Sequence, residues 1–143
     1  MITTTVTTTV RFTLAYWCLL VAALLPLICS VLAKYGKTGL PPEQGGFDNN
    51  NPRTWLAKQV DWRARANAAQ ANTFEALPFF MAAVIIAHLL GTPQGRLDIM
   101  AFIWIVLRIL YIMAYVAGQG TIRSTLWGLA FAVNIGILLI GYR

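Results

Sequence analysis

The residues from Phe12 to Ala33 include no charged side chain, and this run of 22 residues constrains the fold more than any other feature of the sequence. A helix of about 20 apolar residues is long enough to cross the hydrocarbon core of a bilayer. A second charge-free run, of 19 residues, extends from Ser124 to Tyr142. Only 11% of the chain is charged and 58% is hydrophobic, whereas a soluble domain has roughly 25% charged residues. The sequence therefore predicts an all-α integral membrane protein.

Glycine, proline and asparagine divide the chain into four spans. The stretch from Tyr35 to Asn51 is rich in these residues and is predicted to be a loop. Short connections follow at 91–95 and 118–120, so the third and fourth helices should be antiparallel neighbours. We expect one domain over residues 1–143, a four-helix bundle with helices at about 12–34, 53–90, 97–117 and 121–142.

The basic residues predict the orientation of the chain in the membrane. The net charge is +6, from 11 Lys and Arg against 5 Asp and Glu. These cations do not form one exposed cluster, so no nucleic-acid partner is expected. Because cytoplasmic loops retain Lys and Arg, the long first loop should be cytoplasmic and both termini outside. The cations on the side of that loop are Lys34, Lys37, Arg53, Lys58, Arg63, Arg65 and Arg123, and those on the opposite side are Arg11, Arg96 and Arg143.

Several other interpretations are disfavoured. Cleavage of the first span as a signal peptide conflicts with its length, because the apolar region of a signal peptide has about 7–15 residues. Cys18 and Cys29 are separated by about 16 Å along one helix, too far for a disulfide. His88 has no second histidine or suitably spaced carboxylate near it, so no metal site is expected.

Polar residues within the spans are the candidates for a functional site. Arg or Asp at the centre of a membrane helix costs about 2.5–3.5 kcal/mol, and Glu75 and Arg108 are the clearest examples of charge in such positions. We expect these two to be coupled, either as a structural ion pair or within a site. Helical spacing gives three polar faces: Arg65, Asn72, Glu75 and Phe79; Arg108, Tyr111 and Tyr115; and Arg123, Trp127 and Asn134. Faces turned toward a shared interior would suit a small zwitterionic ligand.

These residues also form a pattern that resembles the MAPEG family, membrane-associated proteins in eicosanoid and glutathione metabolism, and most closely its short bacterial members. The resemblance extends over about residues 12–142. It rests on Asn51-Pro52-Arg53, on Arg65-Ala66, Ala69, Asn72, Glu75, Pro78 and Phe79-Phe80, on Arg108, Tyr111 and Tyr115, and on Arg123-Ser124, Trp127 and Gly128.

The resemblance implies a homotrimer in the cell inner membrane, with glutathione bound between subunits near the cytoplasmic side. By this resemblance Arg123 would hold the glutathione thiol as a thiolate, with Tyr115 as the second catalytic residue. The remaining ligand-binding candidates are Arg65, Asn72, Glu75, Arg108, Tyr111 and Ser124. One departure from the pattern is Ala68, where glutathione-using members have an arginine.

The expected function is a glutathione-dependent transferase or peroxidase acting on lipophilic electrophiles. Two alternatives remain open at this point. One is a non-catalytic membrane scaffold or lipid-binding protein of the same fold, and the other is a small transport subunit with a polar pathway.

Overall fold

The structure, a computed structural model, describes residues 12–142, and all the secondary structure in that range is helical. Arg11 and Arg143, which enter the charge count above, lie outside the described residues. The elements are α1 (Leu14–Lys34), the 3₁₀ helix η1 (Pro42–Gln44), α2 (Pro52–Ala57), α3 (Asp61–Leu89), α4 (Gln94–Val116) and α5 (Gly120–Leu139).

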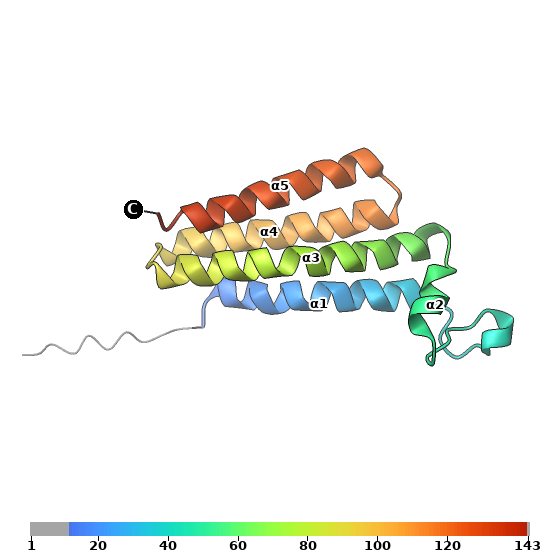
Figure 1. The fold of residues 1–143 in the computed structure, drawn as a ribbon. Coiled ribbons are helices and arrows are strands. Elements are labelled where there is room, and N and C mark those ends of the chain that lie inside the picture. The colour runs from blue at the N-terminus through green and yellow to red at the C-terminus, as the bar shows by residue number, and fades with distance from the viewer. Residues whose placement is uncertain (1–11, 143) are drawn as a thin grey trace, which may run out of the picture.

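Helices α1, α3, α4 and α5 lie side by side as a bundle, and each is long and apolar enough to cross a membrane (Figure 1). The loop after α1, together with α2, forms a small lobe at one end of the bundle (Figure 1). The four predicted spans and the all-helical fold are thus confirmed. Helices α4 and α5 pack against each other, as their short connection predicts.

The expected single helix over residues 53–90 is instead two helices, α2 and α3. The chain leaves helical geometry after Lys58, and Asp61 has a left-handed backbone with φ of 58°. In the lobe, Trp55 is buried, and its ring lies edge-on to Phe47 at 5.2 Å between centres. This packing of α2 onto the loop outweighs the helical propensity of the sequence between the two helices.

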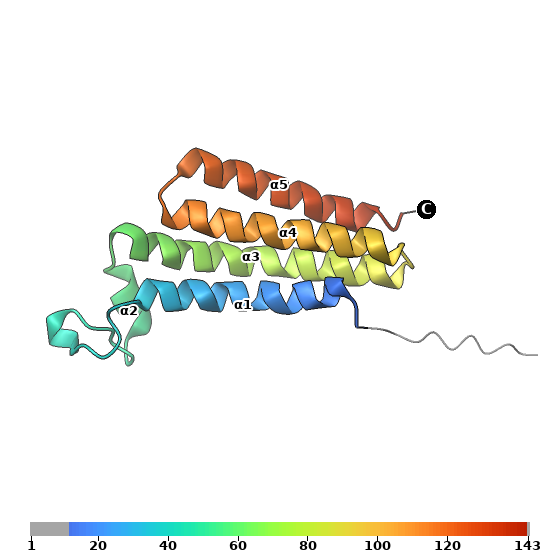
Figure 2. The ribbon, with the colours of Figure 1, turned by 180° about the vertical axis from the view of Figure 1, so that it is seen from behind.

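The core depends on small side chains where helices meet. Helix α1 packs mainly against α3, which Figure 2 shows from the opposite side. Ala15, Ala22 and Ala83 are almost fully buried in this core, and such residues let helix backbones approach closely in membranes. Cys18 and Cys29 are buried free cysteines, as expected. Nearer α4, the rings of Phe80 and Trp104 stack in parallel with centres 3.8 Å apart.

At the end away from the lobe, Asp98 connects α1 to α4. Its Oδ1 accepts hydrogen bonds from the backbone N–H of Ala15 at 2.8 Å and from Nε2 of Gln94 at 2.7 Å. Gln94 also lies 3.1 Å from Nδ1 of His88, so α3 joins the same network. Asp98 thereby satisfies one of the unpaired N–H groups at the start of α1.

At the lobe end, two arginines of α3 bond to backbone carbonyls of neighbouring helices. Arg63 donates to the carbonyl of Tyr35, which follows α1, at 3.1 Å. Arg65 donates through Nε to the carbonyl of Val116, the last residue of α4, at 2.9 Å. Cations are favourable at helix C-termini, so this end of the bundle is also fixed by side chains from an adjacent helix.

Candidate functional site

Arg108 is the most deeply buried charged side chain among the described residues, with 1% of its surface exposed. Its Nη2 donates to Oδ1 of Asn72 at 3.2 Å and to Oγ1 of Thr73 at 3.0 Å. The guanidinium carbon also lies 4.3 Å from the ring centre of Tyr111 and 5.7 Å from that of Trp104. Neutral oxygens and aromatic rings therefore contact the cation on part of its surface, and both kinds of contact stabilise a guanidinium.

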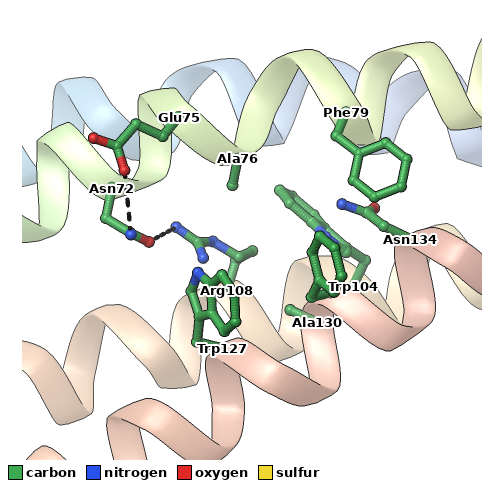
Figure 3. Close-up of a pocket in the computed structure, with 10 residues that line it drawn as sticks. Asn72, Glu75, Ala76, Phe79, Trp104, Arg108, Trp127, Ala130 and Asn134 are labelled. Atoms are coloured by element: carbon green, nitrogen blue, oxygen red, sulfur yellow. Dashed lines mark hydrogen bonds between the residues drawn. The ribbon is translucent and has the colours of Figure 1, made fainter.

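A direct ion pair between Glu75 and Arg108, one of the two forms of coupling considered from the sequence, does not form within residues 12–142. Asn72 lies between them, accepting from Arg108 through Oδ1 and donating from Nδ2 to Oε2 of Glu75 at 3.5 Å (Figure 3). The physical reason is position, because the Glu75 side chain is exposed at the edge of the bundle while Arg108 points into it. The two charges are linked through an amide.

Two adjoining cavities lie between α3, α4 and α5, and they share Asn72 and Trp127. The first, here called the tyrosine cavity, has a volume of about 260 Å³ and lies toward the α5 N-terminus. Its lining consists of Asn72, Tyr111, Tyr115, Arg123, Ser124 and Trp127. The second, the aromatic cavity, has about 190 Å³ and lies beside Arg108 (Figure 3). Its lining consists of Asn72, Glu75, Ala76, Phe79, Trp104, Arg108, Trp127, Ala130, Phe131 and Asn134.

Within the tyrosine cavity, cationic and phenolic groups are close together. The guanidinium carbon of Arg123 lies 4.5 Å from the ring centre of Tyr115. The rings of Tyr115 and Tyr111 meet edge-to-face at 5.6 Å. Arg123 is the fourth residue of α5, so it stands in the first turn of that helix, where the helix dipole is positive. This cavity can therefore attract an anion and offer it phenolic hydrogen bonds.

The structure places seven of the eight candidate residues around these cavities. Arg123, Tyr115, Tyr111, Asn72 and Ser124 line the tyrosine cavity, and Glu75 and Arg108 line the aromatic one. Arg65 lies apart from both. Its Nε is bonded to Val116, and its guanidinium lies against Gly118, where a Cβ would come within 3.5 Å of it.

Two neighbours of Arg108 were missed in the sequence. Thr73 accepts its hydrogen bond, and Trp104 stacks within range of its charge. Trp104 stands one turn before Arg108 on the same helix, and this i, i+4 spacing was the available signal. Thr73 follows Asn72 directly and gave no signal, because which of two adjacent residues meets α4 depends on how the helices pack.

Comparison with protein families decides the identity of the fold. The model of the MAPEG family matches residues 14–142. This chain belongs to the MAPEG family. The match includes all four membrane-spanning helices of this MAPEG protein and every residue that lines its two cavities. No curated protein and no solved structure matches the chain significantly.

Proposed function

We propose that this MAPEG protein binds glutathione in the tyrosine cavity and uses its thiolate to attack, or to reduce, lipophilic electrophiles. It would thus be a glutathione-dependent transferase or peroxidase of the inner membrane. The observation that carries the proposal is the convergence of Arg123, Tyr115 and Tyr111 on one cavity that adjoins a second, rich in aromatic side chains. A thiol site and a lipophilic site side by side are what such a reaction requires.

The charges near the cavity favour a thiolate. A free thiol has a pKa near 8.5, and an adjacent cation or helix N-terminus lowers it. Arg123 supplies both effects. Arg108 adds a second positive charge, and no carboxylate forms an ion pair with it among residues 12–142. The thiolate is the nucleophilic form.

The other cavity residues would hold the peptide part of glutathione. Asn72, which lines both cavities, and Glu75, which bonds to it from the aromatic cavity, offer an amide and a carboxylate on one face of α3, suited to amide and ammonium groups. Ser124 and Tyr111 offer hydroxyls. Ala68 leaves α3 without the arginine that glutathione-using relatives have, and Arg65 is engaged with Val116.

A neighbouring subunit would complete the site. Small-molecule pockets are usually roughly 300–1,000 Å³, and the tyrosine cavity of one chain has about 260 Å³. Trp127, on its wall, is 45% exposed in the single chain. We therefore include a homotrimer in the proposal, with the ligand bound between subunits.

A second candidate function is supported by Ala68. Without an arginine at that position, the fold could serve as a non-catalytic lipid-binding protein or scaffold, in which Arg108 and the tyrosines only stabilise the bundle. Equilibrium binding of glutathione to detergent-purified protein, combined with thiolate absorbance, distinguishes the two functions. Thiolate formation indicates the enzyme, and the absence of both signals indicates the scaffold.

Arg123→Leu tests the thiolate role. We expect the pKa of the bound thiol to rise by about 1–2 units and the rate with a generic electrophile to fall about tenfold or more near neutral pH. Glutathione affinity should change less. Arg96→Leu is the matched control, because Arg96 is an exposed arginine at the opposite end of the bundle. An unchanged rate and pH profile in folded Arg123→Leu protein would overturn the proposal.

A further inference from the structure

Asn134 is a buried polar residue with an unused hydrogen-bond acceptor. It lies in the second half of α5 with 3% of its surface exposed, and its Oδ1 has no hydrogen-bond partner among residues 12–142. A buried amide without a hydrogen bond is costly, about 1–3 kcal/mol from protein mutational data. The fold thus leaves this acceptor free, since Oδ1 of Asn134 forms no hydrogen bond to another described residue. Its amide lines the aromatic cavity.

The walls around Asn134 are aromatic. Figure 3 shows its amide beside Phe79 and the Trp104 indole, away from the guanidinium of Arg108. Phe131 packs against Phe79 with ring centres 5.7 Å apart and stacks on Trp127 at 5.5 Å. Such faces and edges favour contact with another aromatic ring.

The size of the cavity limits what it can hold. An apolar cavity of about 150 Å³ in a protein interior accepts one benzene ring, and the aromatic cavity has about 190 Å³. It therefore has room for one ring with a small substituent. A long acyl chain would not fit within the cavity of the single chain.

We propose that the aromatic cavity binds a compact, single-ring aromatic molecule that carries a hydrogen-bond donor, such as a phenol, and that Asn134 selects for the donor. The ring packs among Phe79, Trp104 and Phe131, and its O–H donates to Oδ1 of Asn134. The inference rests on the proposed function in one respect: bound there, the molecule occupies the place of the lipophilic co-substrate. Its binding requires no thiol.

The position of the cavity agrees with that role. It shares Asn72 and Trp127 with the tyrosine cavity. Asn134 lies two turns beyond Trp127 along α5, so a ring anchored on Asn134 has its opposite end directed toward the shared wall. The hydrogen bond to Asn134 would thus fix which end of the ring faces the thiol.

Two probes of nearly equal shape test the proposal: 4-bromophenol and 4-bromotoluene, which differ in a hydroxyl against a methyl group. Bromine quenches tryptophan fluorescence, and Trp104 and Trp127 line the cavity. We expect saturable quenching of the detergent-solubilised full-length protein, with 4-bromophenol binding about five- to tenfold more tightly, the contribution of one hydrogen bond. Equal affinities of the unmutated protein for the two probes would by themselves overturn the proposal.

Two variants separate the role of the Asn134 amide from that of the cavity volume. Asn134→Leu keeps the volume and should remove the preference for 4-bromophenol, whereas retention of the preference would overturn the role of Asn134. Ala130→Phe keeps Asn134 but fills the cavity, and it should abolish saturable quenching by both probes. Quenching that persists in Ala130→Phe would place the ligand elsewhere. Selective quenching without thiolate formation would refute only the proposed function, and thiolate formation without selective quenching would refute only this inference.

Discussion

Arg108 shows how a charge is kept inside a membrane bundle without an ion pair to any residue that the structure describes. Its guanidinium is held by an amide and a hydroxyl oxygen and lies near two aromatic rings. Removing a partner of a buried charged group strongly destabilises the folded state. The residues that contact the guanidinium of Arg108 are therefore those whose loss should be most damaging.

Thr73→Val should destabilise the protein by about 1.5–3 kcal/mol, because a hydrogen bond to a charged group is lost in a buried place. The free energy of unfolding can be measured by SDS titration in mixed micelles. Thr125→Val is the control, since Thr125 also bonds to the carbonyl four residues before it but is exposed. Thr73 makes that same bond, to Ala69, in addition to its contact with Arg108. Equal losses of unfolding free energy in the two variants would show that the contact with Arg108 contributes nothing to stability.

A double-mutant cycle tests the indirect link between Glu75 and Arg108. We expect Glu75→Gln and Arg108→Met to show a modest interaction energy of about 0.5 kcal/mol, because both side chains bond to Asn72 and members of one hydrogen-bond network are not strictly additive. Asn72→Leu and Arg108→Met should show a larger interaction energy, because these side chains are bonded directly. A coupling between Glu75 and Arg108 as large as that between Asn72 and Arg108 would instead support a direct ion pair.

Most of the candidate site was predictable from residue spacing, because polar side chains on one helical face must turn away from lipid. This reasoning placed Arg108, Tyr111 and Tyr115 together, and their common location is what the structure shows. The partner of Arg108 was not predictable. The choice between Glu75 and the pair Asn72 and Thr73 depends on the rotation of α3 against α4, about which the sequence carries no direct information.

At the scale of helices, the ends of this bundle are stabilised from neighbouring elements. Thr13 precedes α1 but makes no side-chain capping bond within the described part of the chain, and Asp98 of α4 bonds to the first turn instead. Arg63 and Arg65 act in the same way on the carbonyls that follow α1 and end α4. These bonds couple the stability of one helix end to the position of another helix.

Asp98→Ala should cost about 0.5–2 kcal/mol, the usual effect of losing an N-cap. The loss should be local to the first turn of α1. Hydrogen exchange read by mass spectrometry should show faster exchange of the amides at Ala15 to Cys18, with little change in α5. Glu43→Ala, which removes an exposed carboxylate in the lobe, is the control. Unchanged protection of these amides in Asp98→Ala would show that the cap is dispensable.

The spans were predictable, but the break between α2 and α3 was not. Uncharged runs near the length of a bilayer crossing indicate membrane-spanning helices directly. The stretch at Lys58 to Val60 contains no glycine or proline to mark a break. The cause is the contact between Trp55 and Phe47, formed across a loop, which a local reading of propensity does not include.

For the whole molecule, four spans place the start of α1 and the end of α5 at the same end of the bundle, and the lobe at the other (Figure 1). Which end faces the cytoplasm follows only from charge. The lobe and the helix ends next to it contain most of the Lys and Arg residues, and retention of basic loops in the cytoplasm predicts that the lobe is inside. The tyrosine cavity, near the α5 N-terminus, would then open close to the cytoplasmic surface.

Cysteine labelling of intact cells with a membrane-impermeant reagent tests this orientation. Glu43→Cys reports on the lobe and Gly95→Cys on the opposite end. Both positions are exposed, and a side chain at Gly95 meets no atom within 4 Å. Gly45 is less suitable for a cysteine, because its φ of +78° strains any residue with a Cβ.

The native cysteines should give little background, since Cys18 and Cys29 are both buried. We expect Gly95→Cys to be labelled in intact cells and Glu43→Cys only after the membrane is permeabilised, because the positive lobe is retained on the cytoplasmic side. The reverse pattern would place the lobe outside. A glutathione site near the lobe would then face away from the cytoplasm, so the same measurement also tests whether the proposed reaction has access to a cytoplasmic thiol.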